Sequence, residues 1–309
     1  MCTGPMPLHA GVMESATYLL QFSGDLSRAV ESGAKFVVAV NGRPHVPSSG
    51  ILWRPDAVVT TDHTLKRDED VTITLADGRE LPATVAGRDA GTDLAVLRLG
   101  EAAGVAAKIA PEASIKTGHV VLALGSRGLN GIGASFGIIS ALSGAWRTWR
   151  GGRVDRFIRP DVSVYTGFSG GALVDVEGQV IGLNTSGLTR GAGVTLPATT
   201  VSRVVEELLV KGRVRRGFIG IGMHPVRLPD GKTGLVILSI EPQGPAAKAG
   251  IVVGDVLLTL GGEPVTETDA VQSHLEPESI GNPLTARILR GGVPMEVILT
   301  PVERPAREQ

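Results

Sequence analysis

Short apolar runs separated by Gly, Asp and Pro dominate the chain from residue 35 to about residue 205. They cover residues 35–40, 57–61, 70–76, 81–87, 93–99, 119–125, 136–142, 171–176 and 179–185, and ILWR (51–54) begins another. Each run has the length of a strand, and ADGRE (76–80) between two of them is an Asp-Gly hairpin signal. This regular succession of strands and turns predicts a β-sandwich or a β-barrel.

Two segments have helical spacing instead. Apolar residues at 18, 19, 22, 26, 29 and 30 predict an amphipathic helix over 16–32. Residues 199–212 carry a second apolar face, formed by Val201, Val204, Val205, Leu208 and Leu209. RVRRG (213–217) then has the composition of a linker, so we expect a domain boundary there.

A compact unit follows the linker, over residues 218–305. Strands are predicted at 234–241, 255–262, 284–290 and 295–300, and helices at 244–250 and 268–276. No internal repeat, heptad pattern or low-complexity segment interrupts the chain.

Composition narrows the possible classes of protein. A chain of 309 residues normally forms two or three domains. With 30 Lys and Arg against 31 Asp and Glu, it lacks the basic excess of a nucleic-acid binder. Its single cysteine, Cys2, excludes an internal disulfide and a Cys-cluster zinc site.

The first twenty residues contain no Lys or Arg and no long apolar run, so they do not resemble a secretory signal. No stretch approaches the ~20 apolar residues of a membrane span. The sequence as written predicts a cytoplasmic protein without an integral membrane segment. A start site assigned too late would hide a leader and would leave a periplasmic or other extracytoplasmic location open.

Three residues could form a hydrolytic centre. His63 follows the strand AVVTT. Asp93 opens the segment DLAVLRL, and Ser169 lies in the turn TGFSGGAL. Their order, His-Asp-Ser, is that of β-barrel serine proteases. A serine hydroxyl needs an adjacent base such as His, and a buried Asp fixes the tautomer of that His.

Glycines around the serine suit an oxyanion hole, because the backbone must turn sharply and expose N–H groups. Gly167, Gly170 and Gly171 shape this turn. The predicted donors are the N–H groups of Gly167 and Ser169, with that of Phe168 between them. Taken alone, a His such as His63 is more often a surface residue, an Asp such as Asp93 more often a turn residue, and SGG more often an ordinary turn. The occurrence of all three in this order favours a catalytic role.

The residues then resemble a known family. SSGILWRPDAVVTTDHTL, DGRELPATVAGRDAGTDLAVL, TGFSGGALVDVEGQVIGLNTSG and GAGVTLPATTVSRVVEEL are similar to the protease domain of the HtrA/Deg serine proteases. GPAAKAGIVVGDVLLTLGGEPV is similar to a PDZ domain. The resemblance covers roughly residues 20–303.

The resemblance implies a mainly β fold, a chymotrypsin-like double β-barrel followed by an α+β PDZ domain. The expected parts are a flexible tail (1–15), a trypsin-like protease domain (16–212), a linker (213–217), the PDZ domain (218–305) and a short tail (306–309). Within the protease domain, the barrels are expected at about 33–108 and 115–198, followed by the helix 199–212.

The resemblance also implies an activity: ATP-independent degradation of unfolded proteins, by a homotrimer, with no metal or organic cofactor. His63 matches the general base, Asp93 its orienting acid, and Ser169 the nucleophile. Val164 and Ser186 match positions that line the S1 pocket, which implies a small aliphatic P1 residue. Tyr18, Leu19 and Phe22 are candidates for the trimer contact, and a helix that buries them on its own barrel is the alternative.

Four positions depart from the family's pattern: Asp62, Thr166, Phe168 and Ala172 stand where the family has Asn, Pro, Asn and Pro. Phe168 matters most. Either only its backbone is used and the ring packs against protein, or the oxyanion loop is altered. The second alternative predicts a weak or inactive protease homologue that acts as a chaperone or peptide-binding module.

The C-terminal unit is expected to bind apolar peptide C-termini by strand addition. Phe218, Ile219, Gly220 and Ile221 match the loop and edge that hold such a peptide. Val271 and Leu275 would line its side-chain pocket, with ordinary core packing as the alternative. His224 lacks the partner spacing of a metal ligand, and a nucleotide-binding function is set aside because GLNGIGASFG precedes no GK[ST].

Overall fold

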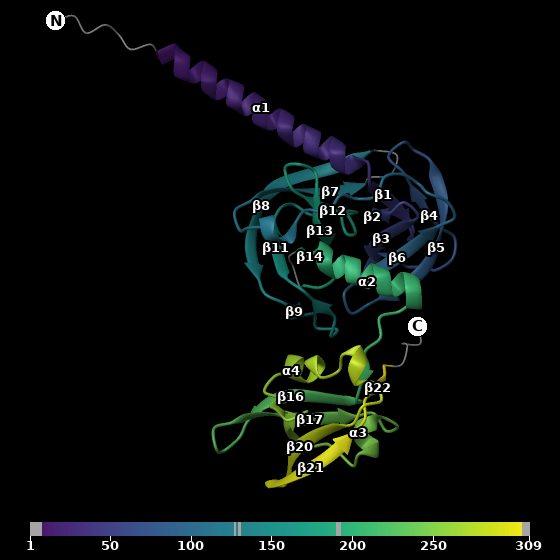
Figure 1. Ribbon diagram of the computed structural model, residues 1–309, viewed down its shortest axis with the longest axis vertical. Coiled ribbons are helices and arrows are strands. Elements are labelled where there is room, and N and C mark those ends of the chain that lie inside the picture. Colours follow the sequence, from purple (N-terminus) through teal and green to yellow (C-terminus); the bar gives the residue numbers. More distant parts are fainter. Residues whose placement is uncertain (1–7, 127, 129–130, 190–192, 305–309) are drawn as a thin grey trace, which may run out of the picture. The chain divides into compact units, whose positions relative to one another are not determined.

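The computed structural model describes residues 8–126, 128, 131–189 and 193–304, with side chains from Thr17 onward. The chain divides into two compact units, Met1–Val214 and Arg215–Gln309, and the division falls within the segment 213–217. Figure 1 shows the N-terminal unit with its two barrels and the C-terminal unit with its open sheet.

Barrel 1 is a closed six-stranded sheet in the order β1-β2-β3-β6-β5-β4. Its strands are β1 (Val37–Asn41), β2 (Ser48–Arg54), β3 (Ala57–Thr61), β4 (Val71–Thr74), β5 (Glu80–Asp89) and β6 (Leu94–Leu99). β3 is buried along its whole length and β6 at all positions but one. Burial on both faces explains why these strands consist mostly of apolar residues and threonine and do not alternate strictly between apolar and polar positions.

Barrel 2 is also closed, in the order β11-β14-β13-β12-β7-β8. Its strands are β7 (Val120–Ser126), β8 (Ile132–Ser143), β11 (Phe157–Asp161), β12 (Ala172–Val174), β13 (Val180–Thr185) and β14 (Val194–Pro197). A small hairpin of β9 (Trp146–Arg147) and β10 (Arg153–Val154) lies between β8 and β11. β11 was not predicted, because Pro160 and two charged residues break its apolar pattern.

Two helices pack on the barrels. α2 (Ala198–Lys211) lies against β5 and β6 and buries the predicted apolar face, including Val201 and Leu208. It ends at Gly212, whose φ of 71° is left-handed and suits glycine. Short 3-10 turns, η1 (Asp62–Thr64) and η2 (Glu112–Ser114), complete the unit.

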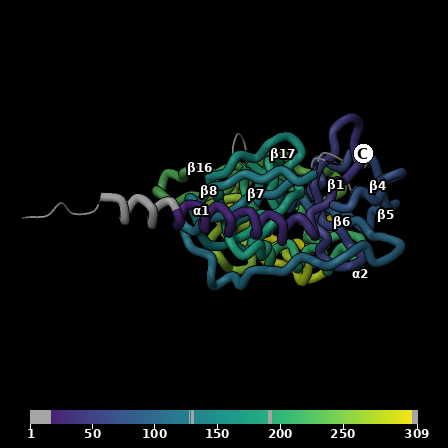
Figure 2. The backbone as a smooth tube through the Cα atoms, turned by 90° about the horizontal axis from the view of Figure 1, so that it is seen from above, coloured from purple at the N-terminus to yellow at the C-terminus, as the bar shows by residue number. Residues whose placement is uncertain are grey.

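The N-terminal helix α1 (Leu8–Ala34) is longer than expected. The prediction of a flexible tail over 1–15 is therefore wrong for residues 8–15, where Leu, Ala, Met and Glu favour helix and no Pro interrupts it. Figure 2 shows α1 passing beside β7 and β8. Tyr18, Leu19 and Leu20 are exposed on it, whereas Phe22 meets Phe136 of β8 edge to face at 6.0 Å.

The C-terminal unit is built on an open sheet in the order β16-β17-β18-β20-β21, with β19 paired to β18. The strands are β15 (Gly217–Phe218), β16 (Ile221–Arg227), β17 (Thr233–Ile240), β18 (Val256–Leu260), β19 (Glu263–Pro264), β20 (Leu284–Arg290), β21 (Val293–Leu299) and β22 (Val302–Glu303). Helices α3 (Pro245–Lys248) and α4 (Thr268–Ser273) and the turn η4 (Pro277–Ser279) accompany them. β16 lies at one edge of the sheet, and α4 packs beside it.

The predicted mainly β architecture with two six-stranded barrels is confirmed. Helix lengths in the C-terminal unit were overestimated, since the predicted 268–276 is helical only over Thr268–Ser273. None of the described helices combines the length and the apolar character needed to span a bilayer.

Candidate active site

His63 and Asp93 are brought together by the pairing of two strands. β3 and β6 are antiparallel, with Thr61 opposite Leu94, so the residues that follow β3 and precede β6 share one end of the barrel. The Nδ1 atom of His63 lies 2.8 Å from Oδ2 of Asp93, and the His63 backbone N–H donates to Oδ1 at 2.9 Å. A carboxylate that accepts this hydrogen bond requires the hydrogen on Nδ1, which is the tautomer of a neutral imidazole that leaves the lone pair on Nε2.

Asp93 is fully buried and its carboxylate has a third donor. The hydroxyl of Thr185, at the end of β13 in barrel 2, donates to Oδ2. Gly187 packs over the pair: a Cβ there would lie 2.6 Å from Asp93 Oδ2 and 2.7 Å from His63 Nδ1. Thr185 and Gly187 flank the predicted pocket residue Ser186 in GLNTSG, and the motif itself carries no signal for their contacts with Asp93.

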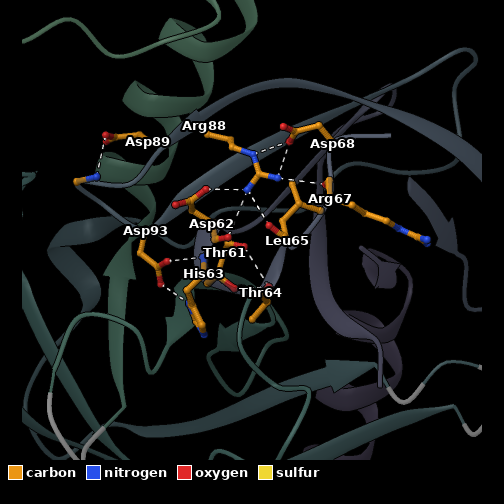
Figure 3. A network of polar contacts seen from close by, with 11 residues as sticks. Thr61, Asp62, His63, Thr64, Leu65, Arg67, Asp68, Arg88, Asp89 and Asp93 are labelled. Atoms are coloured by element: carbon orange, nitrogen blue, oxygen red, sulfur yellow. Dashed lines mark hydrogen bonds and ion pairs between the residues drawn. The ribbon is translucent and has the colours of Figure 1, made fainter. Parts of the chain in front are cut away.

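Arg88 of β5 holds the turn that carries His63. Its Nη1 donates to the carboxylate of Asp62 and to the carbonyl of Leu65, both at 2.9 Å. Its Nε and Nη2 donate to Asp68 at 2.8 and 2.6 Å. Figure 3 shows Arg88 on one side of this turn and the His63–Asp93 pair on the other. Asp62, one of the departures from the family's pattern, thus has a charged partner.

Ser169 lies in a tight turn between β11 and β12, and the residue as a whole is 8% exposed. Its Oγ is 3.2 Å from Oγ of Ser186. Among the described residues, no hydrogen bond joins Ser169 to His63, and the N–H groups of Gly167 and Ser169 donate to no acceptor.

One of the three predicted oxyanion donors is wrong in this conformation. The N–H of Phe168 donates to the carbonyl of Tyr165 at 2.9 Å, closing a turn in which Gly167 has a φ of +93°. A positive φ at the third position of such a turn requires glycine. The N–H groups of Gly167 and Ser169 are left as the candidates.

The Phe168 ring packs inside barrel 2. It is 2% exposed, belongs to the barrel's hydrophobic core, and meets the Tyr165 ring edge to face at 5.3 Å. Gly125 leaves room for it, because a Cβ there would lie 2.5 Å from the ring. This packing corresponds to the first alternative for Phe168, in which the ring is a core residue.

The two predicted S1 residues lie in different surroundings. Val164 is half-buried and lines a cavity of about 570 Å³ together with Arg159, Asp161 and Gly193. Ser186 is exposed beside Ser169 and does not line that cavity. A pocket lined by both remains a prediction.

In the C-terminal unit, the predicted peptide-binding loop lies between β15 and β16. Gly220 has a φ of +75°, and the carbonyls of Ile219 and Gly220 accept hydrogen bonds from Ala246 and Glu241. The N–H groups of Ile219 and Gly220 donate to no acceptor among the described residues. Phe218 and Ile221 are half-buried, Ile219 and Gly220 are buried, and the loop leads directly into the edge strand β16.

Val271 and Leu275 are 0% and 4% exposed and pack in the core of the C-terminal unit with Ile219 and Ile237. In this conformation core packing accounts for both residues, and a pocket-lining role stays a prediction. No group of three or more His, Cys, Asp or Glu side chains is arranged for a metal ion in the described part of the chain.

Comparison with known proteins agrees with this architecture. Residues 48–183 match the trypsin-like peptidase domain family, and residues 217–300 match the PDZ domain family. A probable periplasmic serine endoprotease, DegP-like, from Brucella suis is 37% identical over 242 residues, which are 73% of this chain and 46% of the relative. The periplasmic serine endoprotease DegP of Escherichia coli is 29% identical over 266 residues, covering 81% and 56%. The chain spans about half the length of these curated relatives.

Solved structures match over almost the whole chain. The serine endoprotease from Yersinia pestis is 31% identical with a TM-score of 0.75, covering 91% of this chain and 98% of that structure. The HtrA-type protease AlgW with a decapeptide is 26% identical with a TM-score of 0.76, covering 91% and 99%. Two trypsin-like barrels followed by a PDZ domain are thus common to this chain and these structures, and the chain belongs to the HtrA family of serine proteases.

Proposed function

We propose that the protein is a serine endopeptidase that cleaves unfolded polypeptides without ATP. The observation that supports this most is the buried Asp93 carboxylate bonded to Nδ1 of His63. Gly187 packs on this pair, and its neighbour Ser186 contacts Ser169, whose turn has two unused N–H groups. Such a pair orients the imidazole as a base and stabilises the imidazolium that forms during acyl transfer.

In the proposed reaction, Ser169 Oγ attacks the scissile carbonyl carbon while His63 Nε2 takes the hydroxyl proton. The N–H groups of Gly167 and Ser169 donate to the oxyanion. The C–N bond then breaks, and His63 returns its proton to the leaving amine. A water molecule attacks the acyl-enzyme with His63 again as base, which releases the second product and restores the serine.

Labelling with a fluorophosphonate probe and hydrolysis of unfolded casein test this activity. The wild-type chain should react with the probe and degrade casein without ATP, and Ser169→Ala should do neither. The alternative, a weak or inactive homologue with chaperone activity, is motivated by Phe168. It would be favoured if the wild-type chain ignored the probe yet suppressed client aggregation as well as Ser169→Ala does.

We propose a small aliphatic P1 preference, supported by the β-branched Val164 and the small Ser186 near the serine turn. Cleavage sites in casein, mapped by mass spectrometry, test it. Predominant cleavage after Val, Ala or Ile is expected, and predominant cleavage after aromatic or basic residues would contradict it.

We propose that the C-terminal unit binds apolar peptide C-termini along β16, with the free N–H groups of Ile219 and Gly220 holding the carboxylate. A peptide with an apolar C-terminus should bind and raise the rate of casein hydrolysis. The same peptide with an amidated C-terminus is the control, and equal binding of both forms would count against this mode.

The exposed apolar side chains Tyr18, Leu19 and Leu20 of α1 support a proposed homotrimer, to be measured by light scattering.

The cytoplasmic location predicted from the sequence has no support from the relatives, because both are named as periplasmic proteases. We therefore propose an extracytoplasmic location, which cell fractionation would test.

A further inference from the structure

A serine of barrel 1, Ser49, makes three hydrogen bonds to barrel 2. It lies in β2 and is fully buried. Its hydroxyl donates to the carbonyl of Gly167 at 2.7 Å and accepts from the N–H of Ser126 at 2.9 Å. Its own N–H donates to the carbonyl of Ser169 at 3.1 Å. Both bonds to the serine turn cross from one barrel to the other.

These bonds fix the turn that bears the two free N–H groups. The peptide unit between Gly167 and Phe168 is held at both ends, because its carbonyl accepts from Ser49 Oγ and its N–H donates to Tyr165. Glycine adopts positive and negative φ with similar ease. Without the Ser49 hydroxyl, the peptide unit that follows Gly167 would keep only its hydrogen bond to Tyr165.

The space between Ser49 and the turn is also tight. A Cβ on Gly170 would lie 2.0 Å from the carbonyl oxygen of Ser49, so the turn rests directly on β2. The same carbonyl accepts a hydrogen bond from the hydroxyl of Thr60 in β3 at 2.7 Å. The contact is therefore close and fully hydrogen-bonded on the barrel 1 side.

Ser49 also connects the turn to the base. β2 and β3 are paired, with Gly50 opposite Thr60, and β3 ends at Thr61, two residues before His63. One strand pair of barrel 1 therefore carries both the anchor of the serine turn and the imidazole. The anchor is not expected to touch the substrate, because Ser49 is fully buried.

We propose that Ser49 is a positioning residue that holds the oxyanion turn of barrel 2 in register with His63 of barrel 1. The inference rests on the proposed serine-protease function. It predicts that the Ser49 hydroxyl acts on the bond-making step and leaves the binding of substrate almost unchanged.

The test compares Ser49→Ala, Ser49→Cys and Ser48→Ala in the whole 309-residue chain. Ser48 is a matched control, since it is 1% exposed and its hydroxyl has no hydrogen-bond partner among the described residues. Ser49→Ala should lower kcat about 10- to 100-fold with little change in KM, less than the 10²–10³ of losing an oxyanion donor. Affinity for a peptide boronate, whose adduct with Ser169 mimics the oxyanion, should fall in parallel.

Ser49→Cys separates packing from hydrogen bonding, because a thiol fills the site but is a weak donor. It should behave like Ser49→Ala, and Ser48→Ala like the wild type. Wild-type kcat and boronate affinity in Ser49→Ala, or full activity in Ser49→Cys, would overturn the proposal. Those outcomes leave the protease function intact, whereas a wild-type chain inert to casein and boronate overturns both.

Discussion

At the scale of single residues, the candidate site depends on side chains that satisfy one buried carboxylate. Asp93 accepts from the His63 backbone, the His63 ring and the Thr185 hydroxyl. Hydrogen bonds to a charged group contribute about 1.5–3 kcal/mol each, and more is lost when a buried charge is left short of donors. Thr185 is therefore as much part of the Asp93 environment as His63 is.

Thr185→Val, which keeps the shape and removes the hydroxyl, should lower kcat about 10- to 100-fold by the same range of free energy. Thr185→Ser keeps the donor and serves as the control. Steady-state hydrolysis of a chromogenic peptide measures both variants. Equal activity of the Val and Ser variants would show that the hydroxyl is not needed.

Phe168 gives a second residue-scale prediction. Restoring the family's amide with Phe168→Asn would put a polar group into the core of barrel 2 and leave a void. The cost should be at least about 3 kcal/mol, the lower end for Phe truncation in a core. Urea unfolding followed by Trp fluorescence measures it, because Trp53, Trp146 and Trp149 all lie in the N-terminal unit.

Phe168→Leu is the control for that measurement, since it retains an apolar side chain and should cost clearly less. A Phe168→Asn variant as stable as the wild type would contradict the core role of this ring.

At the scale of elements, local patterns predicted what depends on local sequence. The strand 57–61, the second helix and the contexts of His63, Asp93 and Ser169 are all readable from runs of a few residues. Ser49, by contrast, contacts Gly167 across 118 residues, and Thr185 contacts Asp93 across 92. A small polar residue at the start of a strand carries no sequence signal for such a contact, so these roles appear only once the barrels are folded.

The hairpin between β12 and β13 provides a prediction at this scale. Burial raises the pKa of the Asp175 carboxyl, although its Oδ1 accepts N–H groups from Glu177 and Gln179. A raised folded-state pKa means that the stabilising contribution is present at low pH and lost as pH rises through that pKa.

Asp175→Asn keeps the acceptor and removes the charge. The free energy of unfolding at pH 7 should stay the same or rise by up to about 0.5 kcal/mol. On lowering the pH from 7 to 4, the free energy of unfolding of the wild type should rise relative to that of the variant, because only the wild type has a carboxyl at position 175 that takes up a proton. Urea unfolding by Trp fluorescence at both pH values checks this, and a variant clearly less stable at pH 7 would contradict it.

At the scale of the whole molecule, the two units should respond differently to acid. In the C-terminal unit, Arg290 donates two hydrogen bonds to the buried Asp255, at 2.8 and 2.7 Å, and these hold the pKa of that carboxyl below its usual range. A lowered folded-state pKa stabilises the unit above the unfolded pKa of about 3.9, and this contribution is lost as pH falls through the folded value.

Asp255→Ala should therefore destabilise the C-terminal unit at pH 7 by about 3 kcal/mol, since Arg290 and the N–H of Val252 lose a buried partner. The unit contains no Trp or Tyr. Far-ultraviolet circular dichroism reports the unfolding of both units, whereas Trp fluorescence reports only the N-terminal unit. A transition seen by circular dichroism but not by Trp fluorescence therefore measures the C-terminal unit.

Asp230→Ala, which removes an exposed partner of Lys232, is the control and should leave that transition in place. The difference between Asp255→Ala and the wild type should shrink below about pH 4. A difference that stays constant down to pH 2 would argue against ionisation as its cause.

The dependence of Asp93 on Thr185 also has a consequence for biosynthesis. Barrel 1, with His63 and Asp93, leaves the ribosome before Ser169 and Thr185 exist. Translation proceeds at about 5–20 residues per second, so the 92 residues between Asp93 and Thr185 take roughly 5–20 seconds. Throughout this interval the nascent chain lacks the hydroxyl that completes the aspartate's shell, and for most of it the nucleophile as well. Chains that end before Ser169 therefore lack the proposed nucleophile, and the candidate site is complete only when barrel 2 has been made.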